Sequence, residues 1–498
     1  MRTKNIFFLS IACAVILIIS SCTGNSKSKK IREVNGKTYI TVVVPNLPDP
    51  SSEAPYAQAS YKALQRFIND FPRIFEKKYR ARYEAHPEIY GNYDWSHVRI
   101  NLVRYKGVYI GGRKTDKLAI ATDTAPDLLY TCIRKSTDYI NNGFLHPLDE
   151  FYKRLANKEK ANLIPARIKD IVFREGMDGK KHYWTVPYGT LMGRCVAYRK
   201  DVLKAHNIPY PDDNWTWADF MNICRKTTDI SKGQYGLRLG KGLHESWYWT
   251  SFLWSAGGKV SSLNKLKNTW EYAFDSDEAV KALDFYTQLC WEKHGKYRGY
   301  AYRDVNNVSK MWQDGKITML LDYIEGGCFT RFNKELYGIA PLPLGPDRIR
   351  GGELNCKMLG MNVNLKNPVV RDAAWEYMLS LNSEETRKIY VKKMVEAGEA
   401  EAANPEWLKK YGYASLITPY NKELLRIYKL AIATGIPEPY ETDSSRHVYE
   451  LMTMALRQAA LIEIQGRLAP VGSKKRYQQL KDILETICAH ANNIDKKY

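Results

Sequence analysis

The sequence lacks the short motifs that mark many catalytic and nucleotide-binding sites. No GxxxxGKS or GxxxxGKT loop is present to bind nucleotide phosphates, and neither GxSxG nor HExxH occurs. The nine histidines are scattered, with no closely spaced pair to ligate a metal ion. The sequence therefore predicts no cofactor, no metal site and no enzymatic activity. Glycoside hydrolysis stays open as an alternative, because its two carboxylates come together only in the folded chain.

Long apolar runs are also missing after the first 22 residues, so no membrane-spanning helix is predicted in the rest of the chain. The early run from Ile6 to Ile19 follows Arg2 and Lys4, a pattern typical of a secretory signal peptide. We therefore predict a signal peptide over residues 1–21.

This leader ends in Ile19-Ser20-Ser21-Cys22, which resembles the lipobox of bacterial lipoproteins. The resemblance implies that Cys22 is lipidated and begins the mature chain. An ordinary signal peptide cut nearby and an uncleaved anchor are the alternatives. Residues 22–37 are rich in Lys, Ser, Gly and Asn and bury too little apolar surface to fold. They are predicted to tether an exported, lipid-anchored protein to the cell membrane, on its periplasmic or outer face.

Paired cysteine motifs are absent, since no CxxC occurs among the nine cysteines. Seven cysteines follow Cys22, an odd number, and most lie in apolar stretches where a free thiol behaves as a small apolar side chain. We expect them to be mostly reduced. They are Cys132, Cys195, Cys224, Cys290, Cys328, Cys356 and Cys488.

Acidic residues are fewer than basic ones: 54 Asp and Glu against 75 Lys and Arg give a net charge of +21. The cations are dispersed, and no nucleic-acid-binding motif accompanies them. The sequence therefore predicts no nucleic-acid partner. We interpret the charge as a solvated surface with some attraction to anionic membranes or ligands.

Strands and helices alternate along the chain. A β-branched run at residues 37–45 predicts a buried strand, helical spacing follows at 59–79, and 97–105 alternates like a second strand. A third strand is expected in "PDLLYTCI". This order predicts an α/β fold with a mainly parallel sheet. The tyrosine-rich residues 79–95 are expected to form an inserted loop, and the chain after residue 401 is expected to be helical.

Six groups of motifs then occur in a characteristic order. They are "TAPDLLY" with "NGFLHPLDEF"; "DGKKHYWTVPYGT" with "VAYRKDVLKAHNI" and "NWTWADF"; "WSAGGKV" with "FDSDEAVKALDFY"; "MWQDGKITMLLD"; "YGIAPLPLGP"; and "NPVVRDAAWEYMLSLNSEETRKIY". In this order they resemble the extracellular solute-binding proteins of carbohydrate ABC importers, the family that includes the maltose-binding protein. The resemblance covers roughly residues 39–390.

The resemblance implies the two-lobe, type II periplasmic-binding-protein fold, with a ligand cleft between α/β lobes and extra C-terminal helices here. Lobe 1 is expected over residues 38–189 plus 358–392, and lobe 2 over 190–357 plus 393–498. The implied function is to bind a mono- or oligosaccharide as a monomer and deliver it to the transmembrane subunits of an ABC permease.

Sugar binding takes aromatic rings for the apolar face of the sugar and planar polar side chains for its hydroxyls. The chain has 35 Tyr and 12 Trp to supply such rings. By resemblance, the cleft is lined from both lobes and from the first crossing segment. The ligand-binding candidates are Asn46, Asp49, Thr131, Arg134, Tyr188, Trp247, Trp249, Asp322, Tyr323 and Glu325. A hinge-packing role for Tyr188, a core role for Trp249 and a turn role for Asp49 are the alternatives.

One departure from the family concerns the ligand. Many members have Gly-Pro-Trp where this chain has Tyr323-Ile324-Glu325, so a stacking tryptophan is missing and the ligand's orientation cannot be transferred. Arg134 stands where a close relative has an acid, which favours an acidic sugar. Two other classes stay open: an exported carbohydrate-active enzyme and a structural surface lipoprotein without a ligand.

Overall fold

The computed structural model describes most of the chain from residue 30 onward. The described residues are 30–107, 109–110, 113–114, 116–327, 333 and 335–495. The predicted signal peptide, Cys22 and Cys328 lie outside them. Six cysteines are free thiols, and all but Cys132 are buried. Within the described residues, no helix is both long and apolar enough to cross a membrane.

The folded chain begins earlier than the composition predicted. Strand β1 (Ile31–Val34) pairs antiparallel with β2 (Lys37–Val44), although the flexible tether was expected to reach Lys37. Asn35 and Gly36 both have positive φ angles, 49° and 68°, as a two-residue hairpin turn requires. Ile31 is 4% exposed, so it adds apolar burial that the polar composition of the segment conceals. The tether prediction was therefore wrong for residues 31–37.

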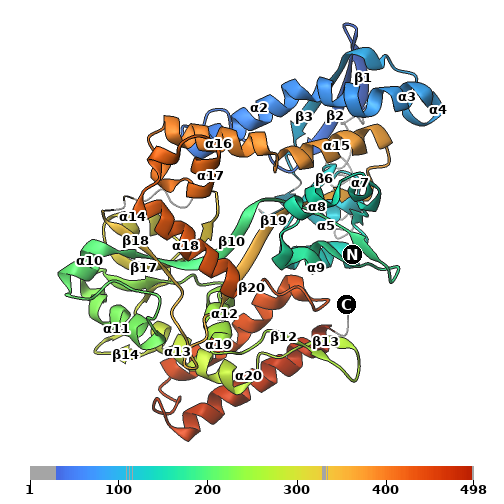
Figure 1. The fold of residues 1–498 in the computed structure, drawn as a ribbon. Helices are drawn as coiled ribbons and strands as arrows, with labels where there is room; N and C mark the ends of the chain where they lie inside the picture. The colour runs from blue at the N-terminus through green and yellow to red at the C-terminus, as the bar shows by residue number, and fades with distance from the viewer. Residues whose placement is uncertain are drawn as a thin grey trace, which may run out of the picture.

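The first hydrophobic core lies around a three-stranded sheet of order β1-β2-β3, in which β2 and β3 (Val98–Arg104) are parallel. The long helix α2 (Pro55–Phe75) and helix α15 (Pro368–Ser380) pack beside this sheet (Figure 1). The β-branched residues of β2 fill the core, as their periodicity predicted.

The tyrosine-rich segment is helical, so the loop predicted there was wrong. Helix α2 continues through a π-helical stretch (Glu76–Arg80) into α3 (Ala81–Ala85). Tyr79 and Tyr83 follow Phe75 at intervals of four residues and are buried on one face. Their hydroxyls donate to carboxylates of α15: Tyr79 to Glu376 at 2.5 Å, and Tyr83 to Asp372 at 2.8 Å. The segment therefore extends the first core.

A nine-stranded sheet connects this core to a second one. Its main path is β16-β11-β17-β10-β19-β20, with β18 beside β10, and β6 and β7 beside β19. The strands are β6 (Leu128–Thr131), β7 (Leu145–His146), β10 (Val186–Arg199), β11 (Tyr235–Arg238), β16 (Ala301–Tyr302), β17 (Ile317–Glu325), β18 (Tyr337–Pro341), β19 (Gly352–Asn362) and β20 (Gly435–Pro437).

Strand β10 passes from one core to the other. Val186 and Leu191 belong to the first core, whereas Val196 and Tyr198 belong to the second. Strand β19 runs antiparallel beside β10 over most of this passage. We call β10 and β19 the crossing strands.

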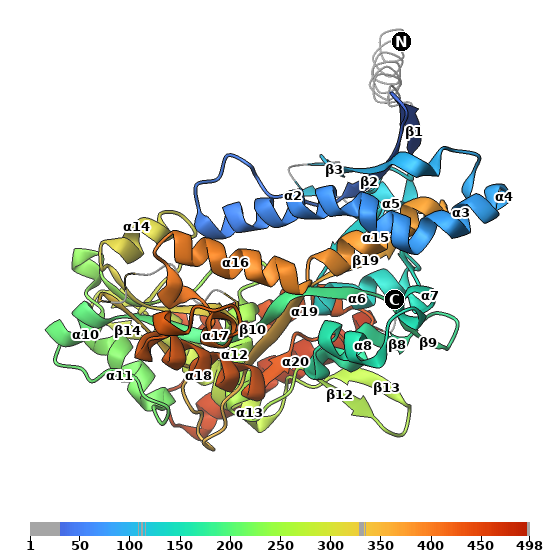
Figure 2. The ribbon, with the colours of Figure 1, turned by 45° about the horizontal axis from the view of Figure 1, so that its top comes forward.

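Helices form most of the second core. They lie in the lower part of Figure 1, and Figure 2 shows the same helices from a second direction. They are α11 (Trp217–Thr227), α12 (Ser246–Ser255), α13 (Asp277–Trp291), α19 (Val448–Ile464) and α20 (Lys474–Asp495). The helical C-terminal region that the sequence predicted is thus confirmed. Part of it belongs to the second core.

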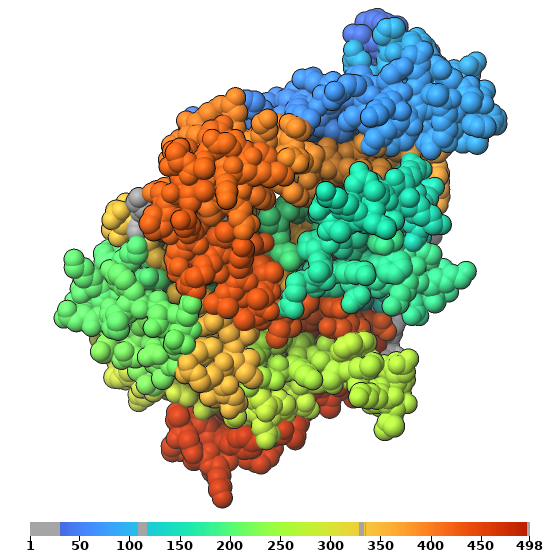
Figure 3. Space-filling view, in the orientation of Figure 1, coloured from blue at the N-terminus to red at the C-terminus, as the bar shows by residue number. Residues whose placement is uncertain are grey.

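Three further C-terminal helices link the two cores on one side of the molecule. Helix α16 (Glu384–Glu396) packs along α2, α17 (Pro405–Lys410) follows, and α18 (Pro419–Thr434) packs on β10. In Figure 3 the surface is hollowed between these orange helices and the teal segment that precedes β10.

Candidate ligand-binding cleft

A cleft of about 1030 Å³ opens beside the crossing strands. Its walls come from the loop after β2, the first turns of α2, the end of β3, the end of β17, and the helices α15 to α17. The volume is at the upper end of the range of ligand pockets, so the cleft has room for a ligand of several rings.

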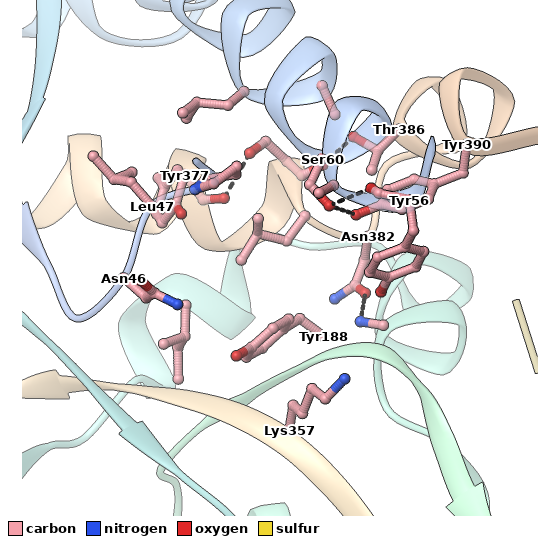
Figure 4. A pocket seen from close by; sticks show the side chains of 18 of the residues that line it. Asn46, Leu47, Tyr56, Ser60, Tyr188, Lys357, Tyr377, Asn382, Thr386 and Tyr390 are labelled. Atoms are coloured by element: carbon pink, nitrogen blue, oxygen red, sulfur yellow. Dashed lines mark hydrogen bonds between the residues drawn. The ribbon is translucent and has the colours of Figure 1, made fainter. Parts of the chain in front are cut away.

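The crossing strands supply the floor. Tyr188 of β10 is the register partner of Lys357 of β19, and both side chains reach into the cleft (Figure 4). The pairing shifts between Tyr188 and Met192, and Gly189 has a φ of +76°. Bulges of this kind change the direction of side chains. Lys357 Nζ donates to Glu325 Oε1 at 3.0 Å, which ties the floor to the end of β17.

Asn382, just after α15, ties the helical wall to the floor. Gly189 N donates to Asn382 Oδ1 at 3.1 Å, and Asn382 Nδ2 donates to the carbonyl of Pro187. Above Asn382 in Figure 4, Ser60 of α2 shares a short hydrogen bond with the Tyr390 hydroxyl of α16. Figure 4 shows these groups above Tyr188 and Lys357.

Seven aromatic side chains line the cleft and give it the mixed character that sugars require. They are Tyr56, Tyr105, Tyr130, Tyr188, Tyr377, Tyr390 and Trp407. Tyr130 remains 41% exposed, and burial of its hydroxyl raises the pKa of Tyr130 to about 12. Burial raises the pKa of Tyr377 to about 12 as well. Both hydroxyls therefore stay protonated near neutral pH and can donate hydrogen bonds.

Three of the ten predicted binding residues line this cleft: Asn46, Tyr188 and Glu325. Asn46 follows β2, Tyr188 lies on the first crossing strand, and Glu325 ends β17. The structure thus brings together three predicted residues that lie far apart in the sequence.

Three other candidates, Arg134, Trp247 and Tyr323, are partly buried and contact charged or aromatic side chains outside the cleft lining. The Arg194 guanidinium lies 3.7 Å from the ring centroid of Trp247, and Tyr323 and Arg194 both contact the carboxylate of Glu353. Arg134 Nε donates to Glu438 Oε1 at 3.0 Å, and its guanidinium lies over the ring of Tyr449. Arg134 is therefore already paired with an acid of the chain, which removes the argument that it selects an acidic sugar.

The last four candidates do not line the cleft. Thr131 and Trp249 are fully buried, Trp249 within the second core. Asp49 is exposed and accepts hydrogen bonds from the backbone and hydroxyl of Ser51, as a turn residue does. Asp322 is exposed, and its carboxylate accepts a hydrogen bond from the amide of Tyr323.

Several cleft residues were not predicted. Lys357, Asn382, Arg387 and Trp407 contribute two cations, an amide and an indole. The alternation along β19 was a usable signal for Lys357, which shares a face with Tyr188 through strand register. For Trp407 the sequence carried no signal, because α17 comes to the cleft only through packing of the C-terminal helices.

More than half of the sequence matches one known protein family. The family model described as bacterial extracellular solute-binding protein matches residues 103–388. The chain belongs to this family. The resemblance that the motifs predicted is therefore confirmed, and Arg387 lies inside the matched region whereas Trp407 lies beyond it.

A binding protein of Brucella abortus is 24% identical over 264 residues, which are 52% of this chain. The match spans 59% of the length of that relative, and a binding protein of Brucella suis matches to the same extent.

Solved structures of the family share the fold. An ABC transporter solute-binding protein of Thermotoga lettingae, bound with α-D-tagatose, is 19% identical, with a TM-score of 0.57 over 87% of this chain and 96% of its own. A Listeria monocytogenes substrate-binding protein in complex with cycloalternan is 16% identical, with a TM-score of 0.57 over 90% and 98%. A maltose-bound protein of T. maritima is 17% identical, with a TM-score of 0.55 over 92% and 99%. The predicted two-lobe, type II α/β fold is confirmed.

Proposed function

We propose that the protein is the substrate-binding component of an ABC importer. It binds a mono- or oligosaccharide in the cleft and delivers it to the permease. The observation that carries the proposal is that the cleft floor is made by the crossing strands, with Tyr188 and Lys357 side by side. The walls come from the first core, from α16 and α17, and from the end of β17, a strand whose Met319 and Leu321 belong to the second core. The sugar ligands of the similar solved structures support a carbohydrate.

Delivery requires that ligand binding change the shape presented to the permease. The two lobes, over residues 38–189 plus 358–392 and 190–357 plus 393–498, would close by a hinge motion at β10 and β19. A ligand that contacts both lobes favours the closed form. The binding component itself catalyses no reaction in this proposal and acts as a monomer.

The proposed location at the cell membrane rests on the predicted signal peptide. Export through the signal peptide 1–21 and lipidation of Cys22 would hold the protein at the cell membrane, close to the permease. Residues 23–29 would be the tether, since Lys30 already forms an ion pair with Asp127 at 2.7 Å.

Thermal unfolding in the presence of neutral and acidic mono- and oligosaccharides tests carbohydrate binding. A ligand at 100 times its dissociation constant adds about 2.7 kcal/mol to the free energy of unfolding, so the melting temperature rises by a few degrees. Tyr188→Ala should lose the rise. Tyr210→Ala, at an exposed tyrosine outside the cleft, should keep it. A folded protein that responds to no carbohydrate in the panel would overturn the proposal.

A further inference from the structure

We propose that the cleft selects an anionic carbohydrate, one that bears carboxylate or sulfate groups. This inference rests on the proposed function and adds the charge of the ligand. Four cations line the cleft, Arg104, Lys106, Lys357 and Arg387, and Glu325 is the only carboxylate among its described lining residues.

The single carboxylate is already neutralised. Glu325 Oε1 accepts a hydrogen bond from Lys357 Nζ at 3.0 Å, and the two form an ion pair on the floor. Three positive charges then remain without a counter-charge from the lining. Within the described chain, none of Arg104, Lys106 and Arg387 forms an ion pair with an acidic side chain.

Asp49 lies in the loop that follows β2, directly after Pro48 of the cleft lining. Hydrogen bonds from the hydroxyl and amide of Ser51 are the main reason that the pKa of Asp49 is lowered, and Arg104 contributes least. Asp49 is outside the lining and engaged by Ser51. It therefore leaves Arg104 available to a ligand.

The three unpaired cations of the lining come from separate elements. Arg104 ends β3 and Lys106 follows it, whereas Arg387 lies on α16. The Arg387 guanidinium is 5.9 Å from the ring centroid of Trp407. A guanidinium near an aromatic face can still present N–H groups in the paired geometry that fits a carboxylate or a sulfate. Aromatic and cationic groups are thus placed to contact the ring and the anionic group of one acidic sugar.

The unpaired positive charges of the lining also affect the free energy of closing the cleft. When a cleft closes on a neutral sugar, three like charges come under weaker solvent screening with nothing to compensate them, and this costs free energy. An anionic ligand supplies the missing counter-charge. The same closure then becomes favourable.

The test is calorimetric titration of the purified protein with three sets of probes matched in length. The sets are oligosaccharides of uronic acids, sulfated oligosaccharides, and neutral gluco-oligosaccharides. We expect at least one acidic set to bind about tenfold or more tightly than the neutral set, with affinity that falls as salt rises. The two acidic sets distinguish carboxylate from sulfate as the recognised group.

Arg387→Gln and Lys106→Gln should each weaken the acidic probe about tenfold, as expected for loss of a charge-assisted hydrogen bond. Arg73→Gln is the matched control, because it removes the same charge from a side chain that is 80% exposed on α2, outside the cleft. Lys106 is exposed, so its variant keeps the test valid if Arg387→Gln does not fold.

The results distinguish a wrong ligand charge from a wrong proposed function. Tight binding of neutral probes alone, lost in Tyr188→Ala, would overturn the anionic ligand and leave the proposed function intact. Equal weakening by Arg73→Gln would also overturn it, because general charge attraction would then explain the preference. Absence of binding by all three sets to folded protein would overturn the proposed function and this inference together.

Discussion

Arg194 and Glu353 form an ion pair between the two crossing strands, with a nitrogen–oxygen distance of 3.2 Å and no solvent exposure of either side chain. Tyr323, Tyr449 and Asn355 donate hydrogen bonds to the same carboxylate. The pair therefore lies at the centre of a network that joins β10, β17, β19 and α19. Any hinge motion at the crossing strands would have to preserve or rearrange it.

Glu353 should make stability depend on pH. Burial raises the pKa of Glu353 to about 7, against the opposing effect of Arg194. Between about pH 4.5 and about pH 7 the native carboxyl holds a proton that the unfolded one, titrating near 4.5, has lost, and the ion pair with Arg194 is complete only above about pH 7. The free energy of unfolding should fall as pH rises from about 4.5 to about 7, because the native state binds more protons than the unfolded state in this range. Urea unfolding at several pH values measures this fall.

Glu353→Gln is the matched variant for that measurement, because it keeps the shape and removes the titration. The difference in unfolding free energy between wild type and variant should change across this pH range. A constant difference would show that Glu353 does not titrate there.

Trp249 should prove structural. It is fully buried in the second core, so Trp249→Ala should lower the free energy of unfolding by about 3–5 kcal/mol, through lost apolar contacts and a cavity. Chemical denaturation gives the value. The control is Trp270→Ala on the β12–β13 hairpin (Ser261–Tyr272), where the side chain is 41% exposed and the expected change is within about 0.5 kcal/mol. Equal effects of the two substitutions would contradict the core assignment.

Trp407 should contribute to ligand binding as well as to the packing of α17. Its ring is partly buried at the cleft wall and packs against Gly327. Trp407→Ala should weaken the best carbohydrate probe by about tenfold through loss of an aromatic surface. It should also lower the melting temperature, because the ring packs on a buried cluster that includes Val391, Met394 and Leu408. Calorimetry with Trp270→Ala as the reference checks this. Unchanged affinity would place the ligand away from α17.

Gly36 should be required by the first hairpin. Its φ is +68°, so Gly36→Ala forces a side chain into the left-handed region and should lower the free energy of unfolding by about 1 kcal/mol. Lys37→Ala, at the exposed neighbouring position, is the control and should be near neutral. If the two variants unfold alike, β1 contributes little to the fold.

Local patterns in the sequence determined much of the architecture. The β-branched run of β2, the alternation of β3 and the helical spacing of α2 predicted their own conformations, because strand and helix periodicities are set by neighbouring residues. The order of motifs also indicated the family.

Two local signals were misinterpreted. Asn35-Gly36 is a hairpin sequence, but the polar composition around it favoured a tether. Phe75, Tyr79 and Tyr83 continue a helical stripe, but their tyrosine content favoured a loop. In both cases an apolar side chain that reached the first core outweighed the average composition of its segment.

The site depended on tertiary structure because its members are distant in sequence. Asn46, Tyr188 and Glu325 could be placed by resemblance. In the folded chain, however, Arg134 pairs with Glu438 and Trp247 lies under the guanidinium of Arg194, contacts that the sequence does not indicate. The sequence by itself determined which segments are strands and helices and that the family's fold would form, since those properties reside in short-range periodicity and motif order. Only tertiary packing decided which aromatic and cationic side chains face the cleft, because the end of β3, the crossing strands and helices α2, α15, α16 and α17 meet through contacts between residues hundreds of positions apart.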